Sequence, residues 1–272
     1  APEKTATGHN FFTSPNPPYG IKLSYYLGNS LLSKFEERQN EESDKFSKGE
    51  IIDYPSAKKL EDEAKEKIPK IYLTISDSQG KVVRRISANK NRGYHEKYWD
   101  LRTFSQRNVD DENNYSGPLV PPGKYSVHIE KFEDDKLEKL TEAYSFDIIQ
   151  IGSKSSQEDR EKLYDFQLNF DELVTLVNEL VDEIDDAIEE VDGEINKSIN
   201  TSSESNLESL NKKRGDIMDL KMILTGTRSL NYADVFSGSP PSVQRRLGNM
   251  GWELYNTTSK PTKTHEMTYK IS

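Results

Sequence analysis

The residues with the greatest potential for metal chemistry lie between Asp182 and Asp192, where the sequence reads DEIDDAIEEVD. A calcium loop of the EF-hand type needs oxygen ligands at fixed positions around a central glycine. The segment Asp192-Gly193-Glu194 has no such frame. A di-iron bundle needs Glu-x-x-His motifs on inward faces, and no histidine lies between His128 and His265. We therefore expect a solvated helix face here, with no metal site and no cofactor.

The four histidines, His9, His95, His128 and His265, are scattered along the chain without paired spacing. The sequence contains no H-E-x-x-H motif, no G-x-S-x-G elbow and no phosphate-binding glycine loop. Glycosidase carboxylates are paired in space rather than in sequence, so spacing alone leaves that chemistry open. The prediction is a protein that is not an enzyme.

Aromatic residues offer a further possibility, because Tyr94, Tyr98, Trp99 and Tyr115 could form a platform for sugar rings. The alternative is a core role, which we favour for Trp99 because its strand alternates and a buried tryptophan packs well between sheets. An apolar patch near the N-terminal aromatics would instead favour a protein contact. The candidate ligand or interaction surface comprises Phe11, Phe12, Tyr19, Tyr94 and Tyr115.

The composition favours an elongated, highly solvated protein. The 272 residues are 33% hydrophobic and 31% charged, with a mean hydropathy of -0.86 and a net charge of -10. Residues 157–200 carry most of the acidic excess, so nothing resembles a basic nucleic-acid footprint. The chain has no cysteine, which excludes disulfides and thiolate chemistry. No apolar run approaches the ~20 residues of a membrane span. The start at Ala1-Pro2 favours a segment of a longer protein.

The first part of the chain has the period of β-strands. The predicted strands are residues 19–27, 70–76, 81–86, 94–101, 123–132 and 143–149. The turn at Asp77-Ser78-Gln79-Gly80 separates the second and third, and Asp134-Asp135 marks a turn between the last two. A charged insertion at about 28–67 interrupts the pattern, with Ser56 as the expected N-cap of a short helix. Polar turns between strands predict an antiparallel β-sandwich of immunoglobulin or fibronectin type.

After Gln157 the period changes to that of an amphipathic helix. The predicted near-heptad seam is Leu163, Phe166, Phe170, Leu173, Val177, Leu180, Ile184, Ile188, Val191 and Ile195. A second, shorter helix follows the connection at residues 202–205, with Arg214 and Lys221 facing the acidic first helix. A third helix is expected from Ser239 to about Leu254, with Ser239 as its cap.

These patterns define a segregated α+β fold with two domains. Residues 1–152 are predicted to form the sandwich, and residues 153–272 a helical hairpin or three-helix bundle. The second helix is too short to cover the whole seam, so we expect the last helix to pack on residues 163–173.

Several segments in order resemble the region that follows the β-propeller in large bacterial sortilin/VPS10-like, BNR-repeat glycosyl-hydrolase-like proteins. The matching segments are FTSPNPPYG at residues 12–20, SYYL at 24–27, DSQGKVVR at 77–84, GYHEKYWDLR at 93–102, GPLVPPGKY at 117–125 and LYDFQ at 163–167. The paired WDL and PPGKY segments are also similar to the immunoglobulin-like module of flagellar hook-capping proteins.

The resemblance implies a post-propeller region of an exported bacterial protein, periplasmic or extracellular, whose propeller lies upstream in the same polypeptide. The Asp-box repeats that name the family do not occur in this chain, so no hydrolase role passes to these residues. The leading hypothesis is a non-catalytic structural and interaction region that caps or braces the propeller. The alternatives are a carbohydrate-binding module, with a glycan rather than a protein as ligand, and a glycoside hydrolase fragment.

Overall fold

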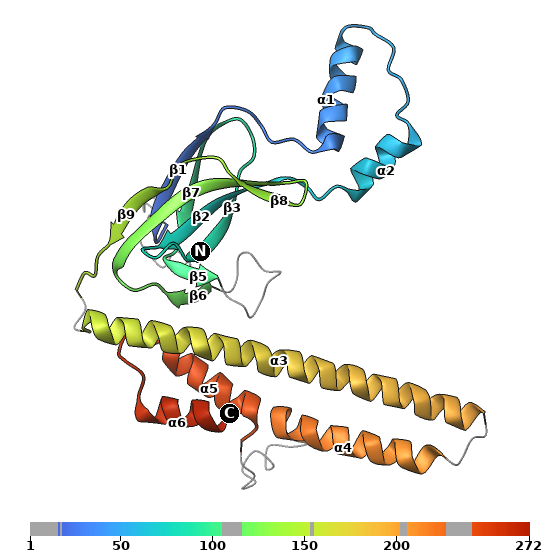
Figure 1. Cartoon of the computed structure of the whole chain (residues 1–272), viewed down its shortest axis with the longest axis vertical. Coiled ribbons are helices and arrows are strands. Elements are labelled where there is room, and N and C mark those ends of the chain that lie inside the picture. The colour runs from blue at the N-terminus through green and yellow to red at the C-terminus, as the bar shows by residue number, and fades with distance from the viewer. Residues whose placement is uncertain (1–15, 17, 105–115, 153–154, 202–205, 227–240) are drawn as a thin grey trace, which may run out of the picture. The chain divides into compact units, whose positions relative to one another are not determined.

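The computed structural model combines helices with antiparallel sheets (Figure 1). It describes residue 16 and residues 18–104, 116–152, 155–201, 206–226 and 241–272. The chain forms two compact units that interleave in sequence. Unit 1 comprises Ala1–Thr74, Arg85–Leu101 and Val127–Ala143, and unit 2 comprises Ile75–Arg84, Arg102–Ser126 and Tyr144–Ser272.

In unit 1, β1 (Ile21–Leu27) pairs with β4 (Gly93–Trp99) in an antiparallel register that sets Ile21 opposite Trp99. At Gly20, just before β1, the backbone passes close to the end of β4 and has a φ of +115°. A Cβ at Gly20 would lie 2.0 Å from the Trp99 carbonyl oxygen, so only glycine fits. The Trp99 side chain is fully buried, which confirms its predicted core role.

The larger sheet has five strands in the order β3-β2-β7-β8, with β9 also paired to β7. The strands are β2 (Lys70–Asp77), β3 (Val82–Ala88), β7 (Gly123–Glu133), β8 (Lys136–Lys139) and β9 (Tyr144–Ile148). In unit 1, Tyr25 and Leu27 of β1 pack with Ile71 and Leu73 of β2 in one buried cluster. Alternating side chains thus form a core against the sheet, as strand periodicity requires.

All six predicted strands are present, but the sequence reasoning missed three short ones. These are β8 and the pair β5 (Arg102–Phe104) and β6 (Ser116–Leu119). The prediction that Asp134-Asp135 joins the last two predicted strands is wrong, because this turn joins β7 to β8 rather than to β9. Both aspartates have positive φ, +48° and +59°, which is the conformation of a two-residue hairpin loop.

The charged insertion contains α1 (Lys34–Ser47) and α2 (Ala57–Lys65). Ser33 and Glu36 form a reciprocal capping box at the start of α1. Ser56 accepts a hydrogen bond from the Lys59 backbone N–H, which confirms it as the N-cap of α2. Neither helix buries a residue, so packing alone does not explain their stability.

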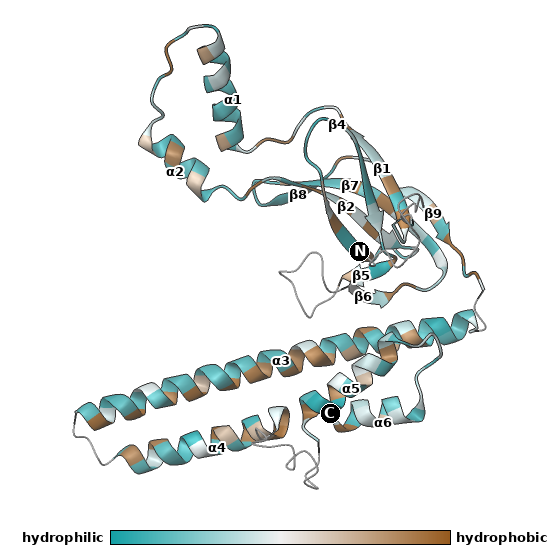
Figure 2. Ribbon diagram, turned by 180° about the vertical axis from the view of Figure 1, so that it is seen from behind, coloured by the Kyte–Doolittle hydropathy of each residue, from teal (hydrophilic) through white to brown (hydrophobic). Residues whose placement is uncertain are grey.

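Unit 2 contains the helices α3 (Gln157–Asn200), α4 (Leu207–Thr225), α5 (Val243–Tyr255) and α6 (Lys263–Ile271). In Figure 2 the ribbon of α3 alternates between brown and teal along its length, as an amphipathic helix should. Among the described residues, no helix combines the length and apolar character that crossing a bilayer requires.

The predicted helical hairpin is confirmed, with α4 running antiparallel beside the far half of α3. The predicted base is also confirmed. Leu163, Phe170 and Val177 of α3 form one buried cluster with Leu247 and Leu254 of α5. Polar contacts fix the same junction, since the Gln167 side chain donates to the Leu254 carbonyl (2.8 Å) and the Tyr255 hydroxyl donates to Asp171 (2.6 Å).

Two details of the helical prediction are wrong. Leu180 does not lie in the buried seam, because its side chain is 42% exposed. The third helix begins at Val243, with Ser242 as the N-cap that accepts from the Arg245 N–H, so Pro241 precedes the helix. Ser239 and the connection at residues 202–205 lie outside the described residues.

Candidate functional site

A pocket of about 620 Å³ lies within unit 2, beside the turn between β2 and β3. Asp77 organises this turn, since its Oδ1 accepts the backbone N–H groups of Gln79 and Lys81, both at 2.9 Å. Tyr125 and Tyr164 line the same pocket. The lining mixes phenol, carboxylate and ammonium groups and suits a polar ligand.

The two tyrosines of this pocket stay neutral at physiological pH. The Tyr125 hydroxyl donates to the Pro121 carbonyl at 2.8 Å, and burial raises the pKa of this phenol. Burial, with the nearby Asp77 and Asp165 charges, raises the pKa of Tyr164 to about 12. Both phenols therefore act as hydrogen-bonding groups in the pocket, and neither is suited to serve as a base near neutral pH.

A polar cluster on the five-stranded sheet surrounds Glu130. Its carboxylate accepts from Thr74 Oγ1 (2.5 Å) and Arg85 Nε (3.0 Å), and lies 3.1 Å from His128 Nε2. Burial alone would raise the pKa of Glu130, but these hydrogen bonds outweigh it and lower the pKa. The ionised carboxylate is thus held in place by three strands, a structural role that the isolated histidine positions did not indicate.

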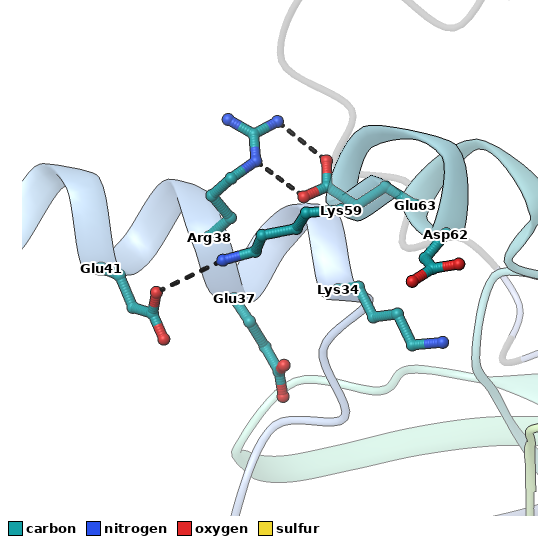
Figure 3. Close-up of a pocket in the computed structure, with 7 residues that line it drawn as sticks. All are labelled: Lys34, Glu37, Arg38, Glu41, Lys59, Asp62 and Glu63. Atoms are coloured by element: carbon teal, nitrogen blue, oxygen red, sulfur yellow. Dashed lines mark hydrogen bonds and ion pairs between the residues drawn. The ribbon is translucent and has the colours of Figure 1, made fainter. Parts of the chain in front are cut away.

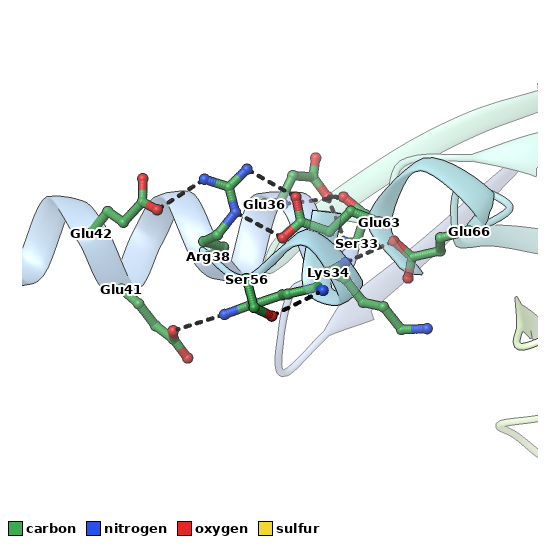
Figure 4. A network of polar contacts seen from close by, with 10 residues as sticks. Ser33, Lys34, Glu36, Arg38, Glu41, Glu42, Ser56, Glu63 and Glu66 are labelled. Atoms are coloured by element: carbon green, nitrogen blue, oxygen red, sulfur yellow. Dashed lines mark hydrogen bonds and ion pairs between the residues drawn. The ribbon is translucent and has the colours of Figure 1, made fainter. Parts of the chain in front are cut away.

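An ion-pair network joins α1 to α2 (Figure 4). Arg38 donates to both oxygens of Glu63, through Nε at 2.7 Å and Nη2 at 2.9 Å, and its Nη1 donates to Glu42 at 2.8 Å. The hydrogen bonds from Arg38 lower the pKa of Glu63, and this bidentate pairing fixes the relative direction of the two helices.

The same helices enclose a polar pocket of about 170 Å³ (Figure 3). Figure 3 shows Lys59 reaching toward Glu41, with which it forms an ion pair at 3.8 Å, and Lys34 on the opposite side near Asp62. Charged side chains therefore occupy the interface where an ordinary helical hairpin has its apolar core. Ion pairs, rather than buried apolar side chains, hold α1 and α2 together in this insertion.

Four apolar side chains lie exposed where α1 ends and in the loop before α2. They are Phe46, Ile51, Ile52 and Tyr54, and we call them the tip. Ile51 is 86% exposed and Tyr54 is 88% exposed. Large apolar side chains gathered on one short segment are uncommon on a surface that contacts only water. The tip is therefore the strongest candidate for a protein contact in unit 1.

Of the five residues proposed from the sequence, the structure describes two, Tyr19 and Tyr94. Tyr19 is exposed at the entry to β1, and Tyr94 is exposed on β4. The Tyr94 hydroxyl donates to Glu96 Oε1 at 2.7 Å and lies 3.0 Å from Ser24 Oγ. Phe11, Phe12 and Tyr115 lie outside the described residues.

Tyr94 instead shares a sheet face with two other tyrosines. It lies directly opposite Tyr26 of β1, and Tyr98 follows on the same side of β4. All three rings are exposed. Sequence reasoning had grouped Tyr98 with Trp99, but the period of two places these neighbours on opposite faces.

Within the described ranges, no group of three or more His, Asp or Glu side chains is arranged to hold a metal ion. Comparisons of the chain with protein-family profiles, with curated proteins and with solved structures found no match. The structure itself shows the class of the protein, a mixed α and β protein with antiparallel sheets and one long helix.

Proposed function

We propose that this chain is a non-catalytic structural and interaction module that caps or braces a β-propeller in a larger exported bacterial protein. The observation that carries the proposal is the tip, an apolar cluster presented by an insertion that has no apolar core of its own. Burying a side chain the size of Ile51 on a partner would contribute about 1.5–3 kcal/mol. The ion pairs of Arg38 keep the supporting helices in position for such a contact.

The propeller and the exported location rest on the resemblance of the ordered segments from residue 12 to residue 167. An immunoglobulin- or fibronectin-like form of the sheets is part of the same proposal. It is supported by the antiparallel pairing and by the burial of Trp99, the tryptophan of the WDL segment.

The test begins with the reading frame upstream of Ala1, which should encode a propeller domain. That domain and this chain are then produced separately, and their association in trans is measured by calorimetry. The tip variant carries Ile51→Ser and Tyr54→Ser, and the control is Ile151→Ser, which is 84% exposed but outside the tip.

We expect the tip variant to weaken association by about tenfold or more, as loss of a central apolar contact does. The control should bind as the parent does. An upstream sequence without a propeller, or equal binding by the tip variant and the parent, would refute the proposal.

A carbohydrate-binding role is the second candidate, favoured by the exposed face formed by Tyr26, Tyr94 and Tyr98. The hydrogen bonds of the Tyr94 hydroxyl hold the Tyr94 ring in place, which lowers the entropy cost of stacking a sugar on it. Affinity electrophoresis in gels that contain soluble polysaccharides tests this role. Tyr94→Ala should abolish any retardation, whereas Tyr144→Ala, an exposed tyrosine on β9, should not. Free migration of the parent protein in every gel would exclude it.

A further inference from the structure

The hairpin of α3 and α4 has one edge that is closed by ion pairs. Asp192 of α3 pairs with Arg214 of α4, and Asp185 pairs with Lys221. These two ion pairs place all four side chains along the same edge of the hairpin. It also fixes the longitudinal register of the two helices, because each pair joins residues at one level.

The opposite edge carries four exposed apolar side chains, Leu176, Leu180, Leu220 and Ile223, which we call the leucine face. An α-helix turns by about 100° per residue, so Leu176 lies about 180° from Asp185 around α3, and Leu180 about 140°. On α4, Ile223 lies about 180° from Arg214 by the same geometry. Leu176 and Ile223 are 60% and 63% exposed, so no described segment covers this edge.

The register of the ion pairs brings the two halves of the leucine face together. Since Lys221 is level with Asp185, Ile223 is level with Glu183, about one helical turn from Leu180. Leu176 and Leu220 extend the apolar stripe at its two ends. From the level of Leu176 to that of Leu220 the stripe covers roughly ten residues, or about 15 Å of helix.

Carboxylates border this stripe on both helices. They are Glu172, Glu179 and Glu183 on α3 and Asp216 and Asp219 on α4, and all five are exposed. Each lies three or four residues from an apolar member of the stripe, the spacing of neighbours on a helix surface. Within the part of the chain that the structure describes, none of the five forms an ion pair. The leucine face is therefore an apolar strip inside an acidic rim.

We propose that the leucine face binds an amphipathic helix of a partner protein, in which leucine-sized side chains at i, i+3 or i+4 and i+7 are flanked by lysine or arginine. Such a helix of about three turns matches the length of the stripe. Its cations would meet the acidic rim, which speeds encounter and fixes the direction of docking.

The acidic rim disfavours the other occupants of an apolar face. A second copy of this chain would bring one ring of carboxylates against another, and like charges in contact oppose association. An anionic lipid surface would be repelled for the same reason. The inference concerns unit 2 alone and does not depend on the proposed role of the tip.

The test uses the whole chain and two synthetic peptides of about eighteen residues. One peptide has leucine at helical spacing and lysine elsewhere, and the other has glutamate in place of lysine. Calorimetry should show one lysine peptide bound per chain, with an affinity that falls as salt rises. The glutamate peptide should not bind.

Paired variants locate the contact. The triple variant Leu176→Ser, Leu180→Ser and Ile223→Ser should weaken binding by about tenfold or more, because it removes the central apolar contacts. The control is Ile199→Ser, an exposed isoleucine of α3 that lies about 40° from Asp185, on the ion-paired side. It should bind as the parent does.

A charge pair of variants provides the second arm. Glu183→Lys should weaken binding and flatten its dependence on salt, whereas Glu189→Lys, on the ion-paired side and with the same change in net charge, should do neither. Equal losses in the two charge variants would mean that the peptide senses only net charge, and the inference would be wrong.

Further outcomes would replace the proposed occupant. Light scattering that shows a dimer dissociated by the triple variant would identify a second copy. Binding to phosphatidylcholine and phosphatidylglycerol vesicles that the triple variant loses would identify a membrane. A triple variant that melts as early as a core variant would show that the face is already covered within the chain.

Discussion

Phe170→Ala tests the junction between α3 and α5 most directly. Phe170 is fully buried in the cluster that also contains Leu163, Leu247 and Leu254. Truncation of a buried phenylalanine costs about 3–5 kcal/mol, as the lost transfer energy plus the cavity left behind. Phe170 also lines a groove of about 220 Å³ between the two helices, so the new space would open into that groove. Water can enter such a space, and we therefore expect a loss near the lower limit, about 3 kcal/mol.

The measurement is urea denaturation followed by circular dichroism at the helical band. Leu176→Ala on the same helix is the control, and it should change stability by less than about 0.5 kcal/mol because the side chain is exposed. A Trp252→Phe background leaves the buried Trp99 as the only tryptophan, so fluorescence reports unit 1 while dichroism reports mainly the helices. Burial predicts that Phe170→Ala lowers the free energy of unfolding by about 3 kcal/mol. A variant whose free energy of unfolding lies within about 1 kcal/mol of the parent's would refute this account of the helical base.

Three further predictions concern single sites. Gly20→Ala should cost about 3 kcal/mol in thermal or chemical denaturation, because a positive φ and the Trp99 carbonyl oxygen both exclude a Cβ; a variant as stable as the parent would contradict the tight approach. Thr103→Val should raise stability by about 1 kcal/mol in the same assay, since the Thr103 hydroxyl is buried and has no hydrogen-bond partner among the residues that the structure describes; a loss would show that the hydroxyl is satisfied. The raised pKa of Tyr164 stabilises the fold below pH 10, and this contribution should disappear as the pH rises toward 12. Tyr164→Phe should remove that part of the alkaline dependence, and an unchanged alkaline profile would be evidence against it.

The sequence was sufficient for elements with strong local signals. Ser56 was recognised as an N-cap because a serine before a run of helix formers satisfies an otherwise free N–H. Long strands such as β2 and β7 show a clear period of two, whereas β5 and β8 are too short to show any period. Their existence depends on partners that are brought together only by the fold.

Leu180 shows why the heptad pattern was misleading. Residues seven apart drift by about 20° around a straight α-helix, because 3.6 residues per turn do not divide seven evenly. Phe166, Leu173 and Leu180 form such a series, and the first two pack against the buried cluster while the third is exposed. The series Leu163, Phe170, Val177, Ile184 and Val191 has the same spacing and stays buried. The side of α3 on which a series lies therefore decides its burial, and the spacing alone does not show which side that is.

The sites that depend on pairing across elements were not accessible from the sequence. The exposed face of Tyr26, Tyr94 and Tyr98 requires the register of β1 against β4. The Glu130 cluster requires three neighbouring strands. The sequence indicates only that Glu130 and His128, two residues apart on one strand, share a face of the sheet. The network of Arg38 with Glu63 requires α2 to return along α1, which charge counts alone do not determine.

The two sets of contacts on α3 differ greatly in the length of chain that must close. The ion pairs with α4 join residues 22 and 36 positions apart, whereas the hydrogen bonds with α5 join residues 84 and 87 positions apart. Contacts between distant residues form later, because the entropy of the longer loop must be lost first. During synthesis the hairpin can therefore close while the cluster around Phe170 still lacks its cover. A chain that ends before Val243 would keep its far half paired and leave the near half of α3 as an open apolar surface, the kind of intermediate that chaperones bind and that aggregates.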